Sequence, residues 1–446
     1  MRWLYTLLAA LALPFANLVV LWRGLRERAY WRGWGERFGR GAPLAGAGQG
    51  LWVHAVSVGE VQAAASLVAA LRAEWPALPL VVTSATPAGR ARACEAFGAG
   101  AGAGAGASAG VDARYAPYDL PWTLRAALRR FRPALLLIME TELWPNLLHE
   151  CVRARVPVII ASARLSARSA ARWAQFRALL QPAMSNVVTV AAQSAVDAQR
   201  FESLGVPSAR IQVCGNIKFD RTPGTQMRQR GQALRSRYAA ARPLWVAGST
   251  HPGEERAALA AHVALRAAHG DALLVLAPRH RPRFDEVAAL LEESGLIWMR
   301  HSAADGAADG AAASISVLLL DTIGELENFY AASDVAFVGG SLVPIGGHTL
   351  LEPAALGVAT LTGLHQRNAP DIARLLDESG CLQFVADGAG LGAALIRLLG
   401  DDALRARRAA AGQATVAANR GALGKVLALV RERLARPLVA VPPASR

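Results

Sequence analysis

Short apolar runs alternate with longer alanine-rich stretches along most of this 446-residue chain, and this alternation restricts its fold more than any other feature. Apolar runs bounded by turn residues are typical of buried strands, and the stretches between them are long enough for helices, so the pattern predicts βα units that build parallel sheets. The predicted strands form two series, at residues 51–56, 80–83, 134–139, 157–161 and 187–192, and at residues 244–247, 272–277, 316–320, 335–338 and 358–361. The sequence therefore predicts an α/β protein with two Rossmann-like, doubly wound domains.

Composition sets the predicted domain boundaries. Residues 1–40 hold an uncharged segment with a basic flank, residues 41–220 the first domain, and residues 244–446 the second domain with terminal helices from about residue 390 to 434. Residues 221–243 are polar and contain Pro223, Gly224 and several arginines, as expected for a linker with a flanking helix. Two glycine- and alanine-rich tracts, residues 98–110 and 303–313, are predicted to be flexible loops.

The N-terminal segment from Trp3 to Trp22 carries no charge and is about long enough to cross a ~30 Å hydrocarbon layer as a helix. One arginine precedes it and six follow within residues 23–40, so the positive-inside rule predicts that the rest of the chain lies at the cytoplasmic face of a membrane. Pro14 interrupts the helical pattern and Asn17 is polar, which leaves a helix lying in the membrane interface as the alternative.

The net charge of +14 suggests a polyanionic partner, but only two of the 48 basic residues are lysines. The arginines are spread along the chain without a nucleic-acid-binding signature, so no nucleic-acid partner is expected. The four cysteines are far apart and predict neither a zinc site nor disulfides. Walker A, HExxH and DxD motifs are absent from the sequence, which favours a metal-independent reaction without a cofactor.

Glu60 follows the first predicted strand in the sequence HAVSVGEVQ. Its spacing from Ser57 is that of a capping box, a structural role that explains both residue types. The alternative is catalytic, because a carboxylate at the carboxyl end of a strand is well placed to act as a general base on an acceptor hydroxyl. Spacing alone leaves both roles open.

Glu140 and Glu142 follow the third predicted strand, in IMETELWPN. Two acids at this point either stabilise the start of a helix or provide a carboxylate that stabilises an oxocarbenium-like carbon during glycosyl transfer. Arg164 and Arg168, in ARLSARSA, are candidate ligands for acceptor phosphates, with an ordinary solvated loop as the alternative. Lys218, in GNIKFD, is a lysine in a chain that otherwise uses arginine almost throughout. This choice indicates that the position requires a compact ammonium group.

Three loops of the second domain have the composition of a nucleotide site. Residues 247–255 lead from a strand into a helix through small residues, Arg279 and His280 follow the next strand, and residues 339–352 combine two glycine pairs with Glu352. Glycines allow a phosphate to approach the backbone, and a nearby carboxylate is a ligand for ribose hydroxyls.

At these residues the chain closely resembles the 3-deoxy-D-manno-octulosonic acid (Kdo) transferases of lipopolysaccharide synthesis. The matching segments run nearly the length of the chain, from WGERFG, HAVSVGE and IMETELWPN through ARLSARSA and GNIKFD to STHPGEE, PRHRPRF, GELENFY and GGHTLLEP. The resemblance implies the two-domain GT-B fold and an inverting, metal-independent transfer of Kdo from CMP-Kdo to lipid IVA at the inner membrane.

The resemblance also implies roles for individual residues. Glu60 is expected to accept the proton, and Glu140 and Lys218 to stabilise the transition state. The residues expected to contact CMP form three groups: Pro278 and Arg279; Ile323, Gly324 and Glu325; and Thr349, Leu350, Leu351 and Glu352. Many members of the family have Asn and Pro where this chain has Thr349 and Leu350, so contact through the Thr349 side chain is less secure than contact through Glu352. A UDP-sugar enzyme of the same fold and a non-catalytic basic membrane protein remain as alternatives.

Overall fold

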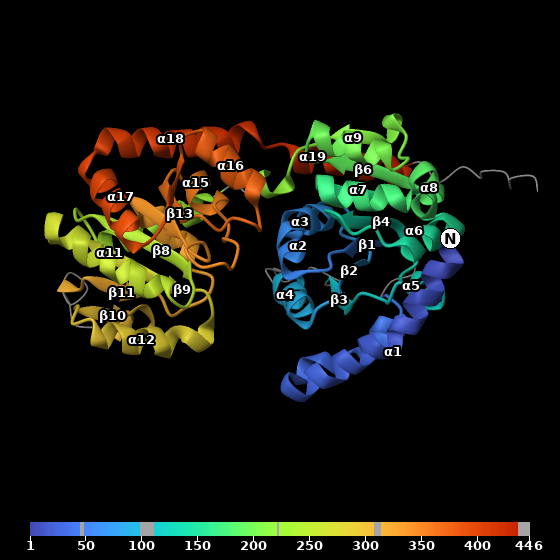
Figure 1. The fold of residues 1–446 in the computed structure, drawn as a ribbon, viewed down its shortest axis with the longest axis horizontal. Coiled ribbons are helices and arrows are strands. Elements are labelled where there is room, and N and C mark those ends of the chain that lie inside the picture. The colour runs from blue at the N-terminus through green and yellow to red at the C-terminus, as the bar shows by residue number, and fades with distance from the viewer. Residues whose placement is uncertain (45–48, 99–110, 221–222, 307–313, 436–446) are drawn as a thin grey trace, which may run out of the picture. The chain divides into compact units, whose positions relative to one another are not determined.

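The computed structural model describes residues 1–44, 49–98, 111–220, 223–306 and 314–435. The chain forms two compact units, one of Met1–Asp220 together with the C-terminal segment from Arg420, and one of Arg221–Asn419 (Figure 1). Each unit holds a seven-stranded, fully parallel sheet, which confirms the prediction of two doubly wound α/β domains. Most of the two predicted loop tracts, residues 99–110 and 307–313, lies outside the described residues, whereas residues 303–306 end the short 3-10 helix η6 (His301–Gly306).

The sheet of the first unit has the strand order β3-β2-β1-β4-β5-β6-β7. Its strands are β1 (Gly50–His54), β2 (Leu80–Ser84), β3 (Asp112–Tyr115), β4 (Pro133–Met139), β5 (Val158–Ala163), β6 (Val188–Ala192) and β7 (Ile211–Val213). Its helices are α1 (Arg2–Arg26), α2 (Val58–Ala63), α3 (Ala65–Glu74), α4 (Pro87–Phe97), α5 (Pro121–Phe131), α6 (Pro145–Ala154), α7 (Ala167–Gln175), α8 (Arg177–Asn186), α9 (Ala195–Ser203) and α19 (Ala422–Ala435).

The sheet of the second unit has the order β10-β11-β9-β8-β12-β13-β14. Its strands are β8 (Leu244–Thr250), β9 (Leu273–Pro278), β10 (Trp298–Arg300), β11 (Val317–Leu319), β12 (Val335–Val338), β13 (Ala359–Gly363) and β14 (Leu382–Val385). Its helices are α10 (Thr225–Tyr238), α11 (Glu254–Ala268), α12 (Phe284–Glu293), α14 (Leu326–Ala332), α15 (Leu351–Leu356), α16 (Pro370–Glu378), α17 (Gly388–Gly400) and α18 (Asp402–Ala418). Of these, α10 is the helix expected beside the linker.

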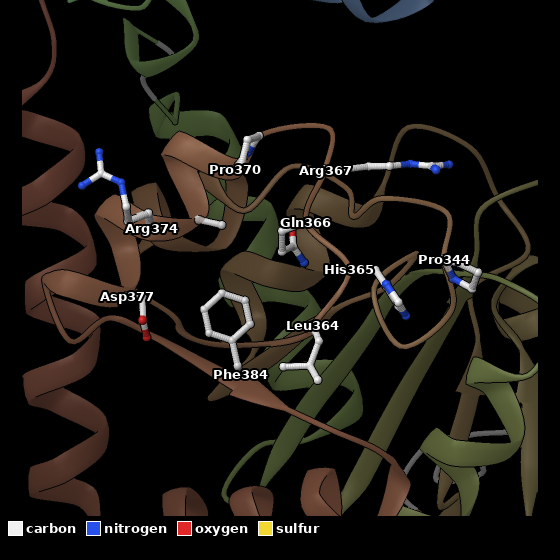
Figure 2. Close-up of a pocket in the computed structure, with 10 residues that line it drawn as sticks. Pro344, Leu364, His365, Gln366, Arg367, Pro370, Arg374, Asp377 and Phe384 are labelled. Atoms are coloured by element: carbon white, nitrogen blue, oxygen red, sulfur yellow. The ribbon is translucent and has the colours of Figure 1, made fainter. Parts of the chain in front are cut away.

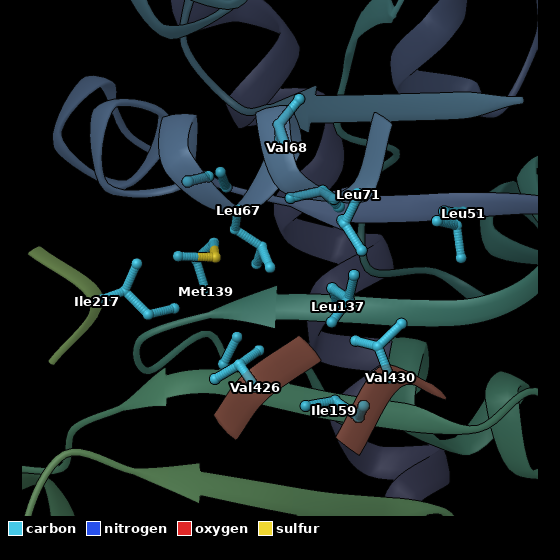
Figure 3. Packing of buried hydrophobic residues seen from close by; sticks show 14 of the residues in the cluster. Leu51, Leu67, Val68, Leu71, Leu137, Met139, Ile159, Ile217, Val426 and Val430 are labelled. Carbon is cyan, nitrogen blue, oxygen red and sulfur yellow. The ribbon is translucent and has the colours of Figure 1, made fainter. Parts of the chain in front are cut away.

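The core of the first unit shows why its central strands form a two-sided sheet. Along β1, Leu51 and Val53 point into the cluster drawn in Figure 3, while Trp52 between them points into the cluster on the opposite face. Leu137 and Met139 of β4 join the first cluster, and Leu136 and Ile138 join the second. Successive side chains of a strand point to opposite faces, so helices on both faces bury the apolar run completely.

The C-terminal boundary predicted from the sequence is wrong. Residues 244–446 do not form one domain, because α19 packs on the first unit through Val426 and Val430, in the same cluster as Leu137 (Figure 3). Both carboxylate oxygens of Asp220 accept hydrogen bonds from the backbone at the start of α19, at Gly421 (2.6 Å) and Leu423 (2.7 Å). The apolar face of α19 therefore places this helix in the first unit, although its position in the sequence suggested the second.

The N-terminal helix α1 has two distinct faces. It continues through Pro14, contrary to the interruption expected there, and its polar side chains bond to the rest of the first unit. Tyr5 donates to Asp119 (2.7 Å), and Asn17 accepts from Trp34 (3.0 Å). The opposite face is an exposed apolar stripe with a helical repeat of three or four residues, made of Leu4, Leu8, Leu11, Phe15, Leu18, Trp22 and Leu25. Its most apolar 18-residue window has a mean hydropathy of 2.1, so α1 is also long and apolar enough to cross a membrane.

Candidate active site

The central strands β1 and β4 of the first unit mark the point where the strand order reverses. From β1 the chain proceeds outward to β2 and β3, and from β4 it proceeds in the other direction to β5, β6 and β7. The loops that follow these two strands therefore diverge, and doubly wound sheets bind their ligands at such switch points. Glu60 lies in the helix that follows β1, and Glu140 follows β4 directly. The two acids singled out by the sequence thus belong to one switch point.

Glu60 forms the capping box that the sequence predicted, and it also has the electrostatics of a base. Its carboxylate accepts the backbone N–H groups of Val56 (2.6 Å) and Ser57 (3.4 Å), and its own N–H donates to the Ser57 hydroxyl (3.3 Å). Burial, together with the negative charges of Glu142 and Glu140, raises the pKa of this half-buried carboxyl group to about 7. The cap fixes the orientation of the carboxylate, so the structural and catalytic roles are compatible.

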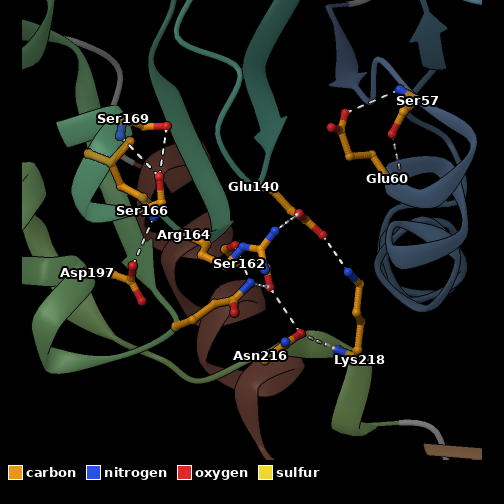
Figure 4. A network of polar contacts seen from close by, with 12 residues as sticks. Ser57, Glu60, Glu140, Ser162, Arg164, Ser166, Ser169, Asp197, Asn216 and Lys218 are labelled. Atoms are coloured by element: carbon orange, nitrogen blue, oxygen red, sulfur yellow. Dashed lines mark hydrogen bonds and ion pairs between the residues drawn. The ribbon is translucent and has the colours of Figure 1, made fainter. Parts of the chain in front are cut away.

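Glu140 and Lys218 form the ion pair at the centre of the site (Figure 4). The Lys218 Nζ atom lies 2.7 Å from Glu140 Oε1, although 78 residues separate the two in the chain. Glu140 is buried and adopts a left-handed backbone conformation with φ of 54°, which few non-glycine residues tolerate. This conformation bends the chain at the end of β4 and holds the carboxylate at the switch point.

A second left-handed residue, Ser162 in β5, supports the lysine. Its φ is 52°, and the pairing of β5 with β6 shifts register at this point. Ser162 lies 3.5 Å from the Asn216 side-chain oxygen, which accepts the backbone N–H of Lys218 (3.0 Å). Gln193 donates to the Ser162 carbonyl (2.9 Å), so a bulged strand and two amide side chains together fix the segment that carries Lys218.

The two arginines proposed for acceptor binding have different positions. Arg164 lies near the acid, with a guanidinium nitrogen 3.9 Å from Glu140 Oε2 (Figure 4). Arg168 is exposed in the first turn of α7, behind the N-cap Ser166. The structure therefore places Arg164 beside Glu140, whereas Arg168 faces solvent.

Glu142 is a site residue to which sequence reasoning gave no separate role. It is half-buried and accepts a hydrogen bond from the Trp144 indole (2.7 Å), and burial together with the charge of Glu140 raises its pKa. Among the charges that raise the Glu60 pKa, Glu142 has the largest effect. Its position two residues after Glu140 was the available signal, since a neighbouring negative charge raises the pKa of an acid.

The second unit has its own switch point, between β8 and β12, and a buried acid organises it. The fully buried Glu254 carboxylate accepts four backbone N–H groups: His251 (3.0 Å), Gly340 (2.7 Å), Ser341 (2.9 Å) and Leu342 (2.9 Å). One side chain therefore ties the loop after β8 to the loop after β12. The sequence analysis gave Glu254 no individual role.

Two histidines lie in the segments that Glu254 holds. The Nε2 atoms of His251 and His348 are 2.8 Å apart, and their ring planes are nearly parallel, with an interplanar angle of 7°. His280, after β9, approaches His251 edge-on at 5.5 Å between ring centroids. Gly340 has φ of 68°, and a Cβ atom there would lie 2.9 Å from the His348 ring, so only glycine fits at this position.

The nine residues expected to contact the nucleotide all lie in the second unit, in three separate segments. Pro278 ends β9, and the backbone N–H of Arg279 bonds to the Thr250 carbonyl (3.0 Å), which holds Arg279 beside the switch point. Leu350 and Leu351 are buried, so their side chains belong to the core, whereas Thr349 is exposed.

The remaining expected contacts lie farther along the same unit. Ile323 and Gly324 are exposed, and Glu325 accepts from the Thr322 hydroxyl and pairs with His301 (3.5 Å). Glu352 lines a small cavity in which Met227 and Glu327 are its neighbours. Arg279 is among the charges that lower the pKa of both His251 and His348, which places it near this histidine pair.

A larger cavity, of about 560 Å³, lies after β13 (Figure 2). It is lined by Leu364 and Phe384 on its apolar side and by Arg367, Arg374 and Asp377 on its polar side. None of the nine residues expected to contact CMP lines it. Within the stretches that the structure describes, no group of three or more His, Cys, Asp or Glu side chains is arranged to hold a metal ion.

Solved structures with a similar fold are sugar-nucleotide enzymes. UDP-GlcNAc 2-epimerase from Neisseria meningitidis, bound to UDP-GlcNAc, matches with a TM-score of 0.56 at 13% identity and covers 87% of this chain and 100% of its own. A putative UDP-N-acetylglucosamine 2-epimerase from Listeria monocytogenes matches with a TM-score of 0.54 at 15% identity and covers 89% of this chain and 100% of its own. The fold is therefore that of the two-domain GT-B class.

Similarity in sequence identifies the family to which the chain belongs. The family model described as 3-deoxy-D-manno-octulosonic-acid transferase (kdotransferase) matches residues 32–221. The 3-deoxy-D-manno-octulosonic acid transferase of Haemophilus influenzae is 37% identical over 437 residues, 98% of this chain and 99% of that protein. The enzyme of the same name from Bordetella pertussis is 37% identical over 92% of this chain and 95% of its own length. The chain belongs to the Kdo transferases, the glycosyltransferases that add Kdo in lipopolysaccharide biosynthesis.

Proposed function

We propose that this Kdo transferase moves Kdo from CMP-Kdo to a hydroxyl group of lipid IVA, with inversion and without a metal ion. The observation that carries this proposal is the Glu60 carboxyl group, which has a pKa of about 7 at the same switch point as the Glu140–Lys218 ion pair. A base with a pKa near the working pH combines adequate ionisation with adequate basicity.

In the proposed reaction, the acceptor oxygen attacks the anomeric carbon of Kdo while its proton passes to the Glu60 carboxylate. The bond between that carbon and the phosphate oxygen breaks, and CMP leaves with the electron pair. A single displacement of this kind inverts the anomeric centre. Glu140 stabilises the oxocarbenium-like carbon, and the Lys218 ammonium, 2.7 Å from Glu140 Oε1, holds this carboxylate in position.

The second unit is the proposed site of the nucleotide. Arg279 provides a positive charge for the phosphate, and Glu352 provides an acceptor for ribose hydroxyls. Because the Leu350 and Leu351 side chains are buried, these two residues would contact CMP through their backbone groups. The groups at residues 278–279, 323–325 and 349–352 thus keep the roles that the family resemblance implies.

The first unit is the proposed acceptor domain, at the cytoplasmic face of the inner membrane. Its helix α1 combines an exposed apolar stripe with bonds from Tyr5 and Asn17 to the body of the unit. A helix that crossed the bilayer would lose these bonds, so they support a helix that lies in the interface. Arg168 is exposed in the same unit, and an arginine near anionic headgroups contributes about 1 kcal/mol to membrane binding.

The test of the reaction is to incubate the full chain with CMP-Kdo and lipid IVA and to weigh the lipid products by mass spectrometry. One or more added Kdo masses are expected, and UDP-GlcNAc in place of CMP-Kdo should give none. Transfer to lipid IVA from UDP-GlcNAc alone would favour the alternative that the enzyme uses a UDP-sugar donor. The similarity of fold is the only support for that alternative. Absence of any product from either donor would overturn the proposal.

The membrane arrangement has its own test. Replacing Leu11 and Phe15 by glutamate puts two charges on the exposed stripe and should release the protein from anionic phospholipid vesicles. A control is Val196→Glu, since Val196 is also an exposed apolar residue of the same unit, on α9. Wild-type protein that stays with the membrane after alkaline carbonate extraction would show that α1 crosses the bilayer.

A further inference from the structure

The histidine pair at the switch point of the second unit has no role in the reaction described so far. Among the expected nucleotide residues, Thr349 adjoins His348 and Arg279 adjoins His280, but neither His251 nor His348 is one of them. The pair stands where a doubly wound sheet binds its ligand, after β8 and shortly after β12.

The contact between the rings fixes how many protons the pair carries. A distance of 2.8 Å between two Nε2 atoms requires one ring to donate and the other to accept. In the neutral pair the donor ring has a bare Nδ1 atom, and the acceptor ring carries its proton on Nδ1. Whichever ring donates, the pair presents one Nδ1–H group and one Nδ1 lone pair. One more proton gives it two Nδ1–H donors and a charge of +1.

The surroundings keep the pair neutral until an anion arrives. Burial and the neighbouring charges of Arg279 and His280 lower the pKa of His348 to about 3, and burial also lowers the pKa of His251. The charged and titratable groups that face the pair are Arg279, His280 and Arg283 from the loop after β9, and Glu254 and Glu255 from α11. Glu254 already accepts four N–H groups, and Glu255 is paired with Arg283.

We propose that the His251–His348 pair binds the phosphate group of the donor nucleotide and takes up one proton from solvent as it does so. The negative charge of the phosphate favours the protonated pair, so the bare Nδ1 gains the proton and becomes a second donor. Arg279 contributes a permanent charge to the same site. His348 is only partly buried, which leaves it accessible to a ligand, and the buried His251 holds its ring in place. This inference rests on the proposed function, because it requires the nucleotide to bind in the second unit.

The test measures proton uptake directly. Binding of CMP to the full chain is followed by titration calorimetry at pH 7.5 in buffers with different ionisation heats, and the slope of heat against ionisation heat gives the protons taken up. We expect up to about one proton per CMP for the wild type, and none for cytidine, which lacks the phosphate. Affinity for CMP should fall as the pH rises above 7, because the complex holds one more proton than the free pair and protons become scarcer.

The variant His348→Gln should bind CMP about 10-fold more weakly and without the uptake seen in the wild type. A matched control is His269→Gln, at the far end of α11, which should behave as the wild type. CMP binding by the wild type without proton uptake, or equal uptake in His348→Gln, would overturn the inference and leave the donor site standing. Absence of CMP binding by the wild-type chain would overturn both this inference and the proposed donor site.

Discussion

Both units have a glutamate in the same local sequence pattern at the same place in the fold, but the two glutamates have different roles. Ser57-Val-Gly-Glu60 follows the first strand of one sheet, and His251-Pro-Gly-Glu254 follows the first strand of the other. In both, the glutamate carboxylate accepts the backbone N–H three residues earlier. Glu254 is fully buried and accepts three further N–H groups from another loop, whereas Glu60 is half-buried beside two other acids.

The difference lies in the partners that each carboxylate meets. Four N–H groups occupy the oxygens of Glu254, so this side chain holds two loops together and has little capacity left for chemistry. Glu60 has only two such partners, and the nearby negative charges favour its protonated form. A glutamate at the end of a strand is therefore structural or chemical according to what the opposing loop presents to it.

The largest expected effect concerns Glu60. Replacement by glutamine keeps the shape and one acceptor oxygen of the cap but removes the base, so turnover should fall by at least ~100-fold while the melting temperature does not fall below that of the wild type. Steady-state kinetics and thermal unfolding measure the two quantities. Near-normal turnover of Glu60→Gln would show that Glu60 has only a structural role, like Glu254, and would contradict the contrast between the two residues.

The pH dependence sharpens the same claim. The ratio kcat/KM should rise with pH through a midpoint of about 7, because only the deprotonated Glu60 accepts a proton. Since the folded pKa lies above the ordinary value of 4.5, the folded chain retains a proton that the unfolded chain loses between these values. Glu60 therefore destabilises the fold as the pH rises through this window, and Glu60→Gln should gain stability relative to the wild type from pH 5 to pH 8.

The next effect concerns the cation beside Glu140. Lys218→Arg preserves the charge, but the guanidinium is larger and its charge is more diffuse than that of the ammonium now 2.7 Å from Glu140. Turnover should fall about 10-fold, with little change in the KM for CMP-Kdo. The control is Lys425→Arg, which changes the only other lysine of the chain, on α19. Equal kinetics in both variants would show that Lys218 has no role in the reaction.

Glu254 should show the opposite profile to Glu60. Glutamine in its place turns an NH₂ group toward backbone donors and leaves one or two of them unpaired, at a cost of about 2–4 kcal/mol in the free energy of unfolding. Thermal unfolding should shift down by several degrees, and the KM for CMP-Kdo should rise more than kcat falls. A stable variant with lost turnover would make Glu254 a chemical residue like Glu60.

The smallest effect is expected at Arg168. Arg168→Ala should raise the KM for lipid IVA about two- to threefold and leave the KM for CMP-Kdo unchanged, because the residue is exposed on the proposed acceptor unit. Arg164→Ala, at 3.9 Å from Glu140, should instead lower turnover. An effect of Arg168→Ala on the donor KM alone would contradict the assignment of the acceptor to the first unit.

The strands that the sequence analysis missed are all at sheet edges. β3 and β7 close one sheet, and β10 and β14 close the other. Central strands are buried on both faces and therefore appear as continuous apolar runs, whereas edge strands are short and carry polar residues such as Arg114 in β3 and Arg300 in β10. Their strand state depends on a neighbour already in position, which a single sequence does not display.

The sequence by itself determined the features that local periodicity and chemistry encode: two doubly wound domains, their central strands, the apolar N-terminal helix and the capping box of Ser57 and Glu60. Motif resemblance also identified Glu140 and Lys218, which lie 78 positions apart. Only the tertiary structure decided that α19 belongs to the first unit, that Arg164 lies beside Glu140 while Arg168 does not, and that Glu254 joins two loops. These outcomes depend on contacts between backbone donors, charges and apolar faces that are distant in the sequence. Burial then determines how strong each contact is.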